Sequence, residues 1–240
     1  MNAAGCLGFA PDAYRFVDMP LVGAFVTNPI SFLPRTPAHG WRYFDFPGGF
    51  LLHTGFPNVG INPVVRRYAR HWSRSAKPVI AHLLARNADE AAAMARRLEA
   101  VEGVIGVEIG FASDTDSERV ADCILAARGE LSVIAQLPFE RSLELAAVAI
   151  QAGAWAVSLA APRGALYAQD GTSIRGRLYG PAILPMAIRL VEQLKTRNIP
   201  TIGAGGIYTQ GDIQAMLAAG AIAVQLDSVL WRGFGLSRSA

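Results

Sequence analysis

The segment from Ile199 to Ser228 constrains the fold of this chain most strongly, because it predicts a strand, a glycine turn, a helix and a second strand. Pro200 to Ala204 is a short apolar run without a helical period, and Ala221 to Leu226 is a second such run. Two parallel strands joined by one helix form a βαβ unit. Gly205 and Gly206 follow the first strand and allow the backbone to turn tightly and approach a ligand, because they carry no Cβ.

Capping residues mark both ends of the helix within this segment. Thr209 followed by Asp212 has the spacing of a capping box, and Gly220 stands where a helix C-terminus favours a left-handed residue. In a (β/α)8 barrel, the loops after strands seven and eight often bind phosphate. The segment therefore has the pattern expected of the last βαβ unit of such a barrel.

The rest of the chain alternates apolar strands with helical segments, which indicates a parallel sheet covered on its outside. We expect strands at residues 1–6, 21–27, 78–84, 104–110, 131–137, 154–159, 200–204 and 221–226, and helices at 11–18, 62–75, 88–101, 116–128, 139–151 and 181–197. Residues 28–60 form an aromatic segment expected to be functional or to carry small strands of its own, and 161–180 a polar loop. The prediction is one α/β TIM barrel spanning residues 1–240.

Composition limits the possible partners. A hydrophobic fraction of 52% in 240 residues suffices for one large core. The charged fraction of 17% is below the usual value of about 25%, which favours a homo-oligomer or a protein complex. The net charge of +3 is not clustered, so nucleic-acid binding is not expected. Two cysteines fit a cytoplasmic protein, and neither a leader nor a long apolar span indicates secretion or a membrane.

Four segments carry a resemblance to one family. Residues 1–5 (MNAAG), 53–60 (HTGFPNVG), 107–109 (VEI) and 176–185 (GRLYGPAILP) are similar, in order, to sequence motifs of the dihydroorotate dehydrogenases. The match extends over nearly the whole chain. The resemblance implies a TIM barrel of the FMN-linked oxidoreductase type, here expected to lack the N-terminal hairpin usual in the family.

The resemblance also implies FMN on the C-terminal face of the barrel. The residues that would contact the cofactor, or its phosphate, are Ala4, Gly5, Thr27, Gln136, Arg177, Gly205, Gly206, Asp227 and Ser228. However, the two family lysines fall on Asn28 and Gln136, and the substrate-binding asparagines fall on or near Leu52, Gly110, Thr115 and Ala161. Dihydroorotate is therefore not expected as the substrate, and FMN binding itself is left open.

Two residues are candidates for catalysis. The family's catalytic Cys or Ser aligns with Ser113, although Ser113 is also placed to cap the helix that starts near Asp116. His53 lies in the loop expected to approach a substrate and is a general acid–base candidate, with a structural role as the alternative. The four histidines are scattered, so a metal site is not expected.

Two residues at the expected phosphate end have opposing charges. Asp227 stands where the family has glycine, and its carboxylate would compete with a bound anion. It is alternatively a cap for a helix starting near Val229. Arg177 replaces a family glycine and is either a phosphate-binding fork or a solvated loop residue.

Two functions remain open. The first is a divergent dihydroorotate dehydrogenase-like protein with a redox or phosphate-ligand site at the C-terminal face of the barrel. The second is a non-catalytic structural or regulatory subunit of a protein complex that has lost FMN.

Overall fold

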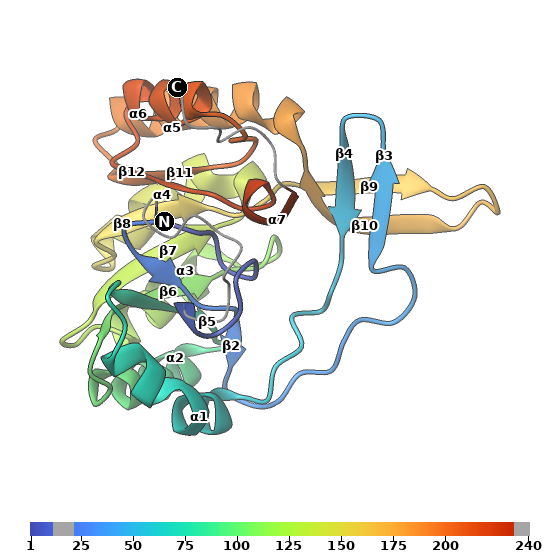
Figure 1. Cartoon of the computed structure of the whole chain (residues 1–240). Helices are drawn as coiled ribbons and strands as arrows, with labels where there is room; N and C mark the ends of the chain where they lie inside the picture. The colour runs from blue at the N-terminus through green and yellow to red at the C-terminus, as the bar shows by residue number, and fades with distance from the viewer. Residues whose placement is uncertain (12–21, 233–240) are drawn as a thin grey trace.

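A parallel sheet curls around a central axis in the computed structural model, which describes residues 1–11 and 22–232 (Figure 1). The short β2 (Ile30–Ser31) pairs with one strand of this sheet, β5 (Val79–Leu84). In spatial order, the other strands of the sheet are β1 (Phe25–Val26), β5 (Val79–Leu84), β6 (Val104–Gly110), β7 (Ser132–Leu137), β8 (Ala156–Leu159), β11 (Thr201–Ala204) and β12 (Ala223–Gln225).

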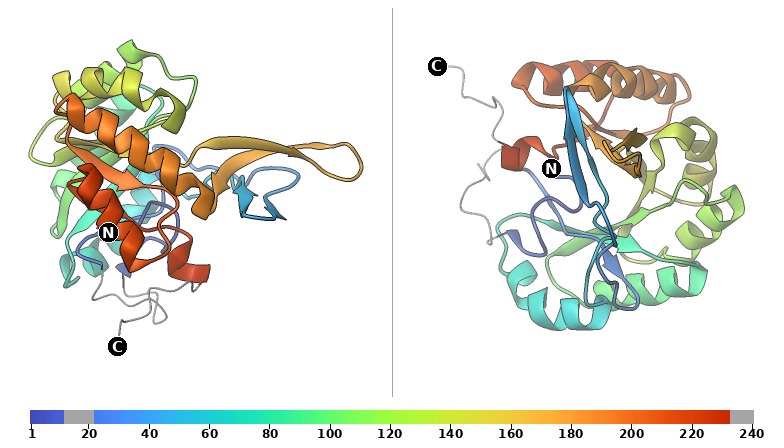
Figure 2. Two further views of the ribbon diagram at one scale, coloured as in Figure 1. Left: turned by 90° about the horizontal axis from the view of Figure 1, so that it is seen from above. Right: turned by 90° about the vertical axis from the view of Figure 1, so that its right-hand side faces the viewer.

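Helices cover the outer side of this sheet, as the right-hand view of Figure 2 shows. On α2 (Ala88–Glu99), for example, the buried side chains of Ala91, Met94, Ala95 and Leu98 follow helical spacing and face the strands. The other helices are α1 (Ile61–Ser73), α3 (Ser117–Ala126), α4 (Ser142–Gln151), α5 (Leu184–Thr196), α6 (Gln210–Ala219) and the short α7 (Val229–Arg232). The main core therefore lies between the sheet and the helices.

The two edges of the curled sheet meet at Asn2. An isolated parallel bridge joins Asn2 to Leu226, and the Ala3 amide donates to the Leu226 carbonyl at 2.7 Å. On the other side, the Asn2 side chain accepts from the Val26 amide at 2.9 Å and donates to the Val26 carbonyl at 2.7 Å. The side-chain amide of Asn2 thus replaces backbone pairing at this junction between the two edges, which is called the seam below. The fold is an incomplete (β/α)8 barrel, which confirms the TIM-barrel prediction. The strand expected at residues 1–6 is present only as the isolated bridge at Asn2.

A second, antiparallel sheet projects from the carboxyl ends of the barrel strands (Figures 1 and 2). Its strands, in spatial order, are β3 (Tyr43–Phe46), β4 (Gly49–Leu52), β10 (Ser173–Tyr179) and β9 (Arg163–Tyr167). The stacked rings of Phe50 and Tyr179, 5.0 Å apart, connect its two hairpins. The expectation of small strands within residues 28–60 is confirmed, whereas the polar loop expected at 161–180 is wrong, because most of it forms the β9–β10 hairpin.

The local signals in the last βαβ unit are confirmed. Thr209 and Asp212 form a complete capping box at the start of α6, and Gly220 ends that helix with a left-handed φ of 117°. Most other expected helices and strands are present, with ends shifted by a few residues. The helix expected at 11–18 falls almost entirely outside the described residues.

We predict that Asn2→Ala destabilises the fold by about 2–4 kcal/mol, because it leaves the buried amide and carbonyl of Val26 without partners. Urea denaturation would measure the change in the free energy of unfolding. The matched control is Asn62→Ala on the exposed side of α1, where we expect a change within about 0.5 kcal/mol. Equal stability of the two variants would contradict the role of Asn2 as a seam.

Candidate functional site

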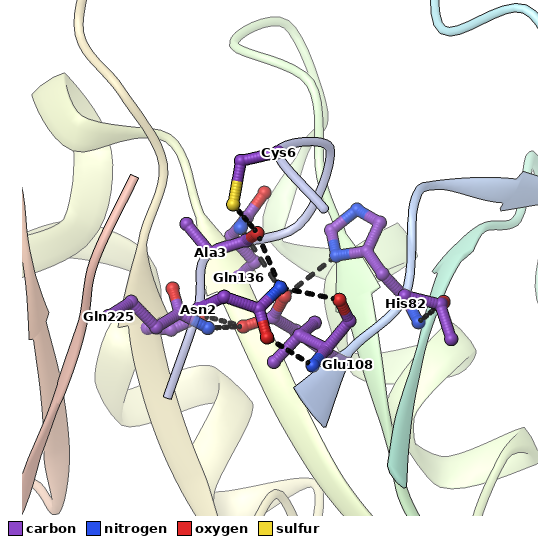
Figure 3. Close-up of polar contacts among 10 residues, drawn as sticks. Asn2, Ala3, Cys6, His82, Glu108, Gln136 and Gln225 are labelled. Carbon is purple, nitrogen blue, oxygen red and sulfur yellow. Dashed lines mark hydrogen bonds and ion pairs between the residues drawn. The ribbon is translucent and has the colours of Figure 1, made fainter. Parts of the chain in front are cut away.

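A buried carboxylate, that of Glu108, lies on the axis of the barrel (Figure 3). His82 Nδ1 donates to its Oε2 at 2.7 Å, and Gln136 Nε2 lies 3.4 Å from the same oxygen. Ser158 Oγ and Gln225 Nε2 donate to its Oε1 at 2.6 and 2.7 Å. These five side chains come from β5, β6, β7, β8 and β12, so one carboxylate links strands from most of the sheet.

Hydrogen bonds keep Glu108 ionised despite its burial. Burial by itself would raise the pKa of the Glu108 carboxyl, but the hydrogen bonds from His82, Ser158 and Gln225 outweigh it and lower the pKa below its ordinary value. Because an ionised carboxylate only accepts hydrogen bonds, His82 carries a proton on Nδ1. The network is almost fully satisfied within the described residues. The exception is the amide oxygen of Gln225, which is buried without a partner.

Above this network, a cleft separates the carboxyl ends of the barrel strands from the second sheet. One cavity of about 410 Å³ is lined by Phe56, Gly110, Ala161 and five arginines, and is hereafter called the arginine cavity. A second cavity of about 400 Å³ lies beside Gly5, Cys6, Asn28 and Asp227. A small cavity of about 50 Å³ lies at the glycine turn after β11. Open space of this size at the carboxyl ends of barrel strands is where ligands bind in this architecture.

The glycine turn packs closely against Ile183 and Leu184 at the start of α5. Gly205 and Gly206 have φ values of 108° and 73°, and a Cβ on Gly206 would lie 2.3 Å from the Leu184 amide nitrogen. Among the described residues, no backbone carbonyl accepts a hydrogen bond from either amide. Only glycine therefore fits at these positions, and two donors remain available for an anion.

Asp227 gives the same end of the cleft an acidic group. It follows β12, lines both the small and the second cavity, and is half-buried. Burial raises the pKa of the Asp227 carboxyl to about 7, and the positive charge of Arg177 offsets only part of this shift. No ion pair joins the two residues in the described part of the chain. The Asp227 carbonyl accepts from the Leu230 amide at 2.9 Å, so its backbone, not its carboxylate, makes the turn into α7.

The structure brings most of the expected cofactor residues to one cleft. Ala4, Gln136, Arg177, Gly205, Gly206, Asp227 and Ser228 line the small cavity, and Gly5 lines the second one. The Ser228 hydroxyl lies 2.7 Å from that of Tyr208. Thr27 lines none of these cavities: it is buried, and its Oγ1 accepts the His82 amide at 3.0 Å.

The two candidate catalytic residues lie at separate positions. Ser113 is exposed in the loop after β6 and lines the arginine cavity. The alternative role of Ser113 as a helix cap is wrong, because the Asp116 side chain accepts from the Arg119 amide as the N-cap of α3. His53 is exposed and lines a separate cavity of about 110 Å³ next to Arg35, Arg163 and Arg177.

Two groups of residues in the site were not predicted from the sequence. His82, Ser158 and Gln225 each stand alone within an apolar strand, and a polar residue inside such a run is the signal that indicates them. Arg35 and Arg163 lie in segments without a strong strand pattern, and the pairing of the second sheet brings them to Arg177. Within the described part, no three His, Cys, Asp or Glu side chains gather closely enough to hold a metal ion.

The fold is an incomplete α/β barrel with cavities at the carboxyl ends of its strands. The family model described as dihydroorotate dehydrogenase matches residues 1–112 and 161–237, so the chain belongs to the dihydroorotate dehydrogenase family. The chain is 31% identical over 254 residues to the "dihydroorotate dehydrogenase B (NAD(+)), catalytic subunit" of Trichlorobacter lovleyi, covering 95% of this chain and 82% of that protein. The protein of the same name from Pelobacter propionicus is 32% identical over 250 residues, with the same coverage.

The residues present fit FMN, the cofactor implied by this family, only in part. The free amides of Gly205 and Gly206 suit a phosphate, but the half-buried Asp227 carboxylate lies in the same cavity. At the two lysine positions, Asn28 Oδ1 accepts the Gly8 amide at 2.9 Å and Gln136 points to Glu108. Neither residue can supply the positive charge that the family lysines give. No helix in the described residues is long and apolar enough to cross a membrane.

We predict that Asp227 makes stability fall as the pH rises from about 4 to about 7. Its folded-state pKa of about 7 lies above the unfolded value of about 3.9, so the proton favours the folded state and is lost across this window. The variant Asp227→Asn has no such proton to lose. Its melting temperature should equal that of the wild type near pH 4 and exceed it near pH 8, and a constant difference would contradict the assignment.

Proposed function

We propose that this chain is a divergent dihydroorotate dehydrogenase-like protein with a redox or phosphate-ligand site at the C-terminal face of the barrel. We further propose that it does not use dihydroorotate. The observation that carries the second proposal is the wall of the arginine cavity: Gly110 and Ala161 stand where the resemblance places asparagines. A planar polar anion such as orotate needs several fixed donors and acceptors, and each buried polar ligand group left unpaired costs about 1–3 kcal/mol.

The surroundings of Gly110 do not accommodate an asparagine side chain at this position. A Cβ at Gly110 would lie 2.7 Å from His82 Nε2. The His82 ring cannot move away without breaking its hydrogen bond to Glu108, which holds the centre of the barrel. An asparagine side chain at position 110 is thus incompatible with the present position of His82, which supports the proposal of a ligand different from dihydroorotate.

The proposed function includes a protein partner. Two of the relatives are named catalytic subunits, and a subunit is part of a larger assembly. This chain exposes Trp41 just before β3 and Tyr167 at the end of β9, at 54% and 75%, and large exposed aromatic side chains favour an interface. We propose that the protein functions as a homo-oligomer or in a complex with another protein.

We predict no turnover of dihydroorotate, with or without added FMN. A dye-reduction assay would measure the rate against a blank without protein, and a family member that retains both lysines and the asparagines would serve as the positive control. Dye reduction above the blank that requires dihydroorotate would refute the proposal.

We predict that FMN binds weakly near pH 8 and that Asp227→Gly strengthens binding. At about 4 Å, two like charges repel by about 4 kcal/mol at an effective dielectric of 20, which is several hundredfold in affinity. Titration calorimetry would compare wild type, Asp227→Gly, the charge-removing Asp227→Asn and the remote control Asp122→Asn on α3.

The pH dependence of the same titration provides an internal check. Because the Asp227 pKa is about 7, wild-type affinity for FMN should rise as the pH falls from about 8 to about 6, whereas both Asp227 variants should lack this rise. Tight FMN binding by the wild type at pH 8, unchanged or weakened in Asp227→Gly, would show that the site has been wrongly assigned.

A further inference from the structure

Three arginines from distant parts of the chain meet at one side of the cleft. Arg35 precedes β3, Arg163 begins β9, and Arg177 lies in β10; all three line both the arginine cavity and the adjoining cavity of about 110 Å³. We call Arg35, Arg163 and Arg177 the arginine triad. The Arg177 guanidinium lies over the Phe56 ring, 4.2 Å from its centroid, which fixes its plane against an apolar wall.

The fold brings the like charges of the triad close together. Arg163 and Arg177 are directly opposite in the antiparallel pairing of β9 with β10, so their side chains leave the same face of the sheet. Like charges in that relation repel. Burial lowers the pKa of Arg177, and the positive charge of Arg163 acts in the same direction, while Tyr179 and Asp227 offset part of the shift. The fold therefore keeps these groups together at a cost in stability, which is typical of a binding site.

The described residues do not neutralise the triad. Glu90 and Glu144 make the ion pairs recorded for arginines, and their partners are Arg86 and Arg141. Arg35 instead donates from Nε to the Gly55 carbonyl at 3.1 Å. Glu140, which also lines the cavity, accepts the Arg163 amide nitrogen at 2.6 Å rather than its guanidinium. Among the described residues, no carboxylate thus forms an ion pair with the guanidinium group of Arg163 or Arg177, and the charge of Asp227 acts on Arg177 only from a distance.

The backbone around the triad is well supported. Arg35 and Asn58 exchange two backbone hydrogen bonds of 2.8 and 3.1 Å, and Asn58 Oδ1 accepts from the amides of Ser31 and Gly60. On the opposite wall, Arg141 Nη1 donates to the carbonyls of Ser113 and Thr115 at 3.2 and 2.5 Å. Hydrogen bonds within the protein therefore fix both walls of the cavity without a ligand.

We propose that the arginine cavity binds a small organic anion with at least two negative charges, held by the arginine triad with its carbon skeleton against Phe56 and Ala161. Planar guanidinium groups pair two hydrogen bonds with each carboxylate or phosphate, so three of them suit two such groups. A volume of about 410 Å³ lies within the range of about 300–1,000 Å³ typical of small-molecule sites. This inference names the ligand class of the proposed function, but it requires no bound flavin.

Titration calorimetry on the full chain without flavin tests the proposal. The probes are succinate, malonate, inorganic phosphate and the monoanion acetate. We expect at least one dianion to bind about tenfold or more tightly than acetate, with affinity falling as salt is added. A preference for succinate or malonate assigns a dicarboxylate, and a preference for phosphate assigns a phosphate ester. Failure of all dianions to bind below about 10 mM would overturn the proposal.

Variants then locate the binding. Arg163→Gln and Arg177→Gln should each weaken dianion binding about tenfold or more, and Arg163→Lys should restore only part of the loss because an ammonium cannot pair as a planar fork. Arg66→Gln on the exposed side of α1 is the matched control. Melting temperatures would verify folding, and Arg163 is exposed enough that its replacement should not unfold the protein. Dianion binding unaffected by both triad variants would overturn the proposal.

The outcome separates this inference from the proposed function. If dianions bind to the triad but neither FMN nor a phosphate ligand binds at Gly205 and Gly206, the anion site stands and the redox function fails. If FMN binds and dianions do not, the redox function stands and the triad has no ligand of this class.

Discussion

The hydrogen bonds to the Glu108 carboxylate are the constraint on which the rest of the structure depends. A charge in the middle of a barrel is costly unless its oxygens are fully paired, and removing one partner of such a group typically costs 3–5 kcal/mol. The donors come from four other strands, so each strand must keep its register for His82, Ser158 or Gln225 to reach the carboxylate. A slip of one residue would turn any of these side chains to the other face. The register in turn places the loops that line the cleft.

The cleft has opposite charges at its two ends. Asp227 and the amides of Gly205 and Gly206 are at one end, and the arginine triad is at the other. Arg177 lines the cavities at both ends, so its charge acts on Asp227 as well as on the arginine cavity. A ligand that spans the cleft would therefore need its negative groups near the triad and a neutral or protonated contact at Asp227. This asymmetry is a stronger guide to the ligand than the family resemblance alone.

The sequence was sufficient to predict the barrel, because its strands are short apolar runs and its last helix has unambiguous caps at Thr209 and Gly220. It also placed Arg177 and Asp227 at the C-terminal face. The β9–β10 hairpin turns at Ala168 to Gly171, where the Gly171 amide donates to the Ala168 carbonyl at 2.9 Å and Gly171 has a φ of 79°. Its strands are hard to predict because Gly164 and Gly176 interrupt them, and glycine inside a strand weakens the strand pattern. The arginine triad could not be predicted, since it depends on the pairing of β4 with β10, whose partners are 125 (177 − 52) to 129 (179 − 50) residues apart. Pairing over such a distance leaves no local pattern in the sequence.

The seam at Asn2 links the order of synthesis to the completion of the fold. Asn2 contacts both Val26 and Leu226, and these two partners are 200 residues apart in the chain (226 − 26). At about 5–20 residues per second, their synthesis is separated by roughly 10 to 40 seconds, during which one edge of the sheet is unpaired. An unpaired parallel edge is a template for another chain. The growing polypeptide therefore exposes this edge until β12 has been made, whereas the finished barrel closes it.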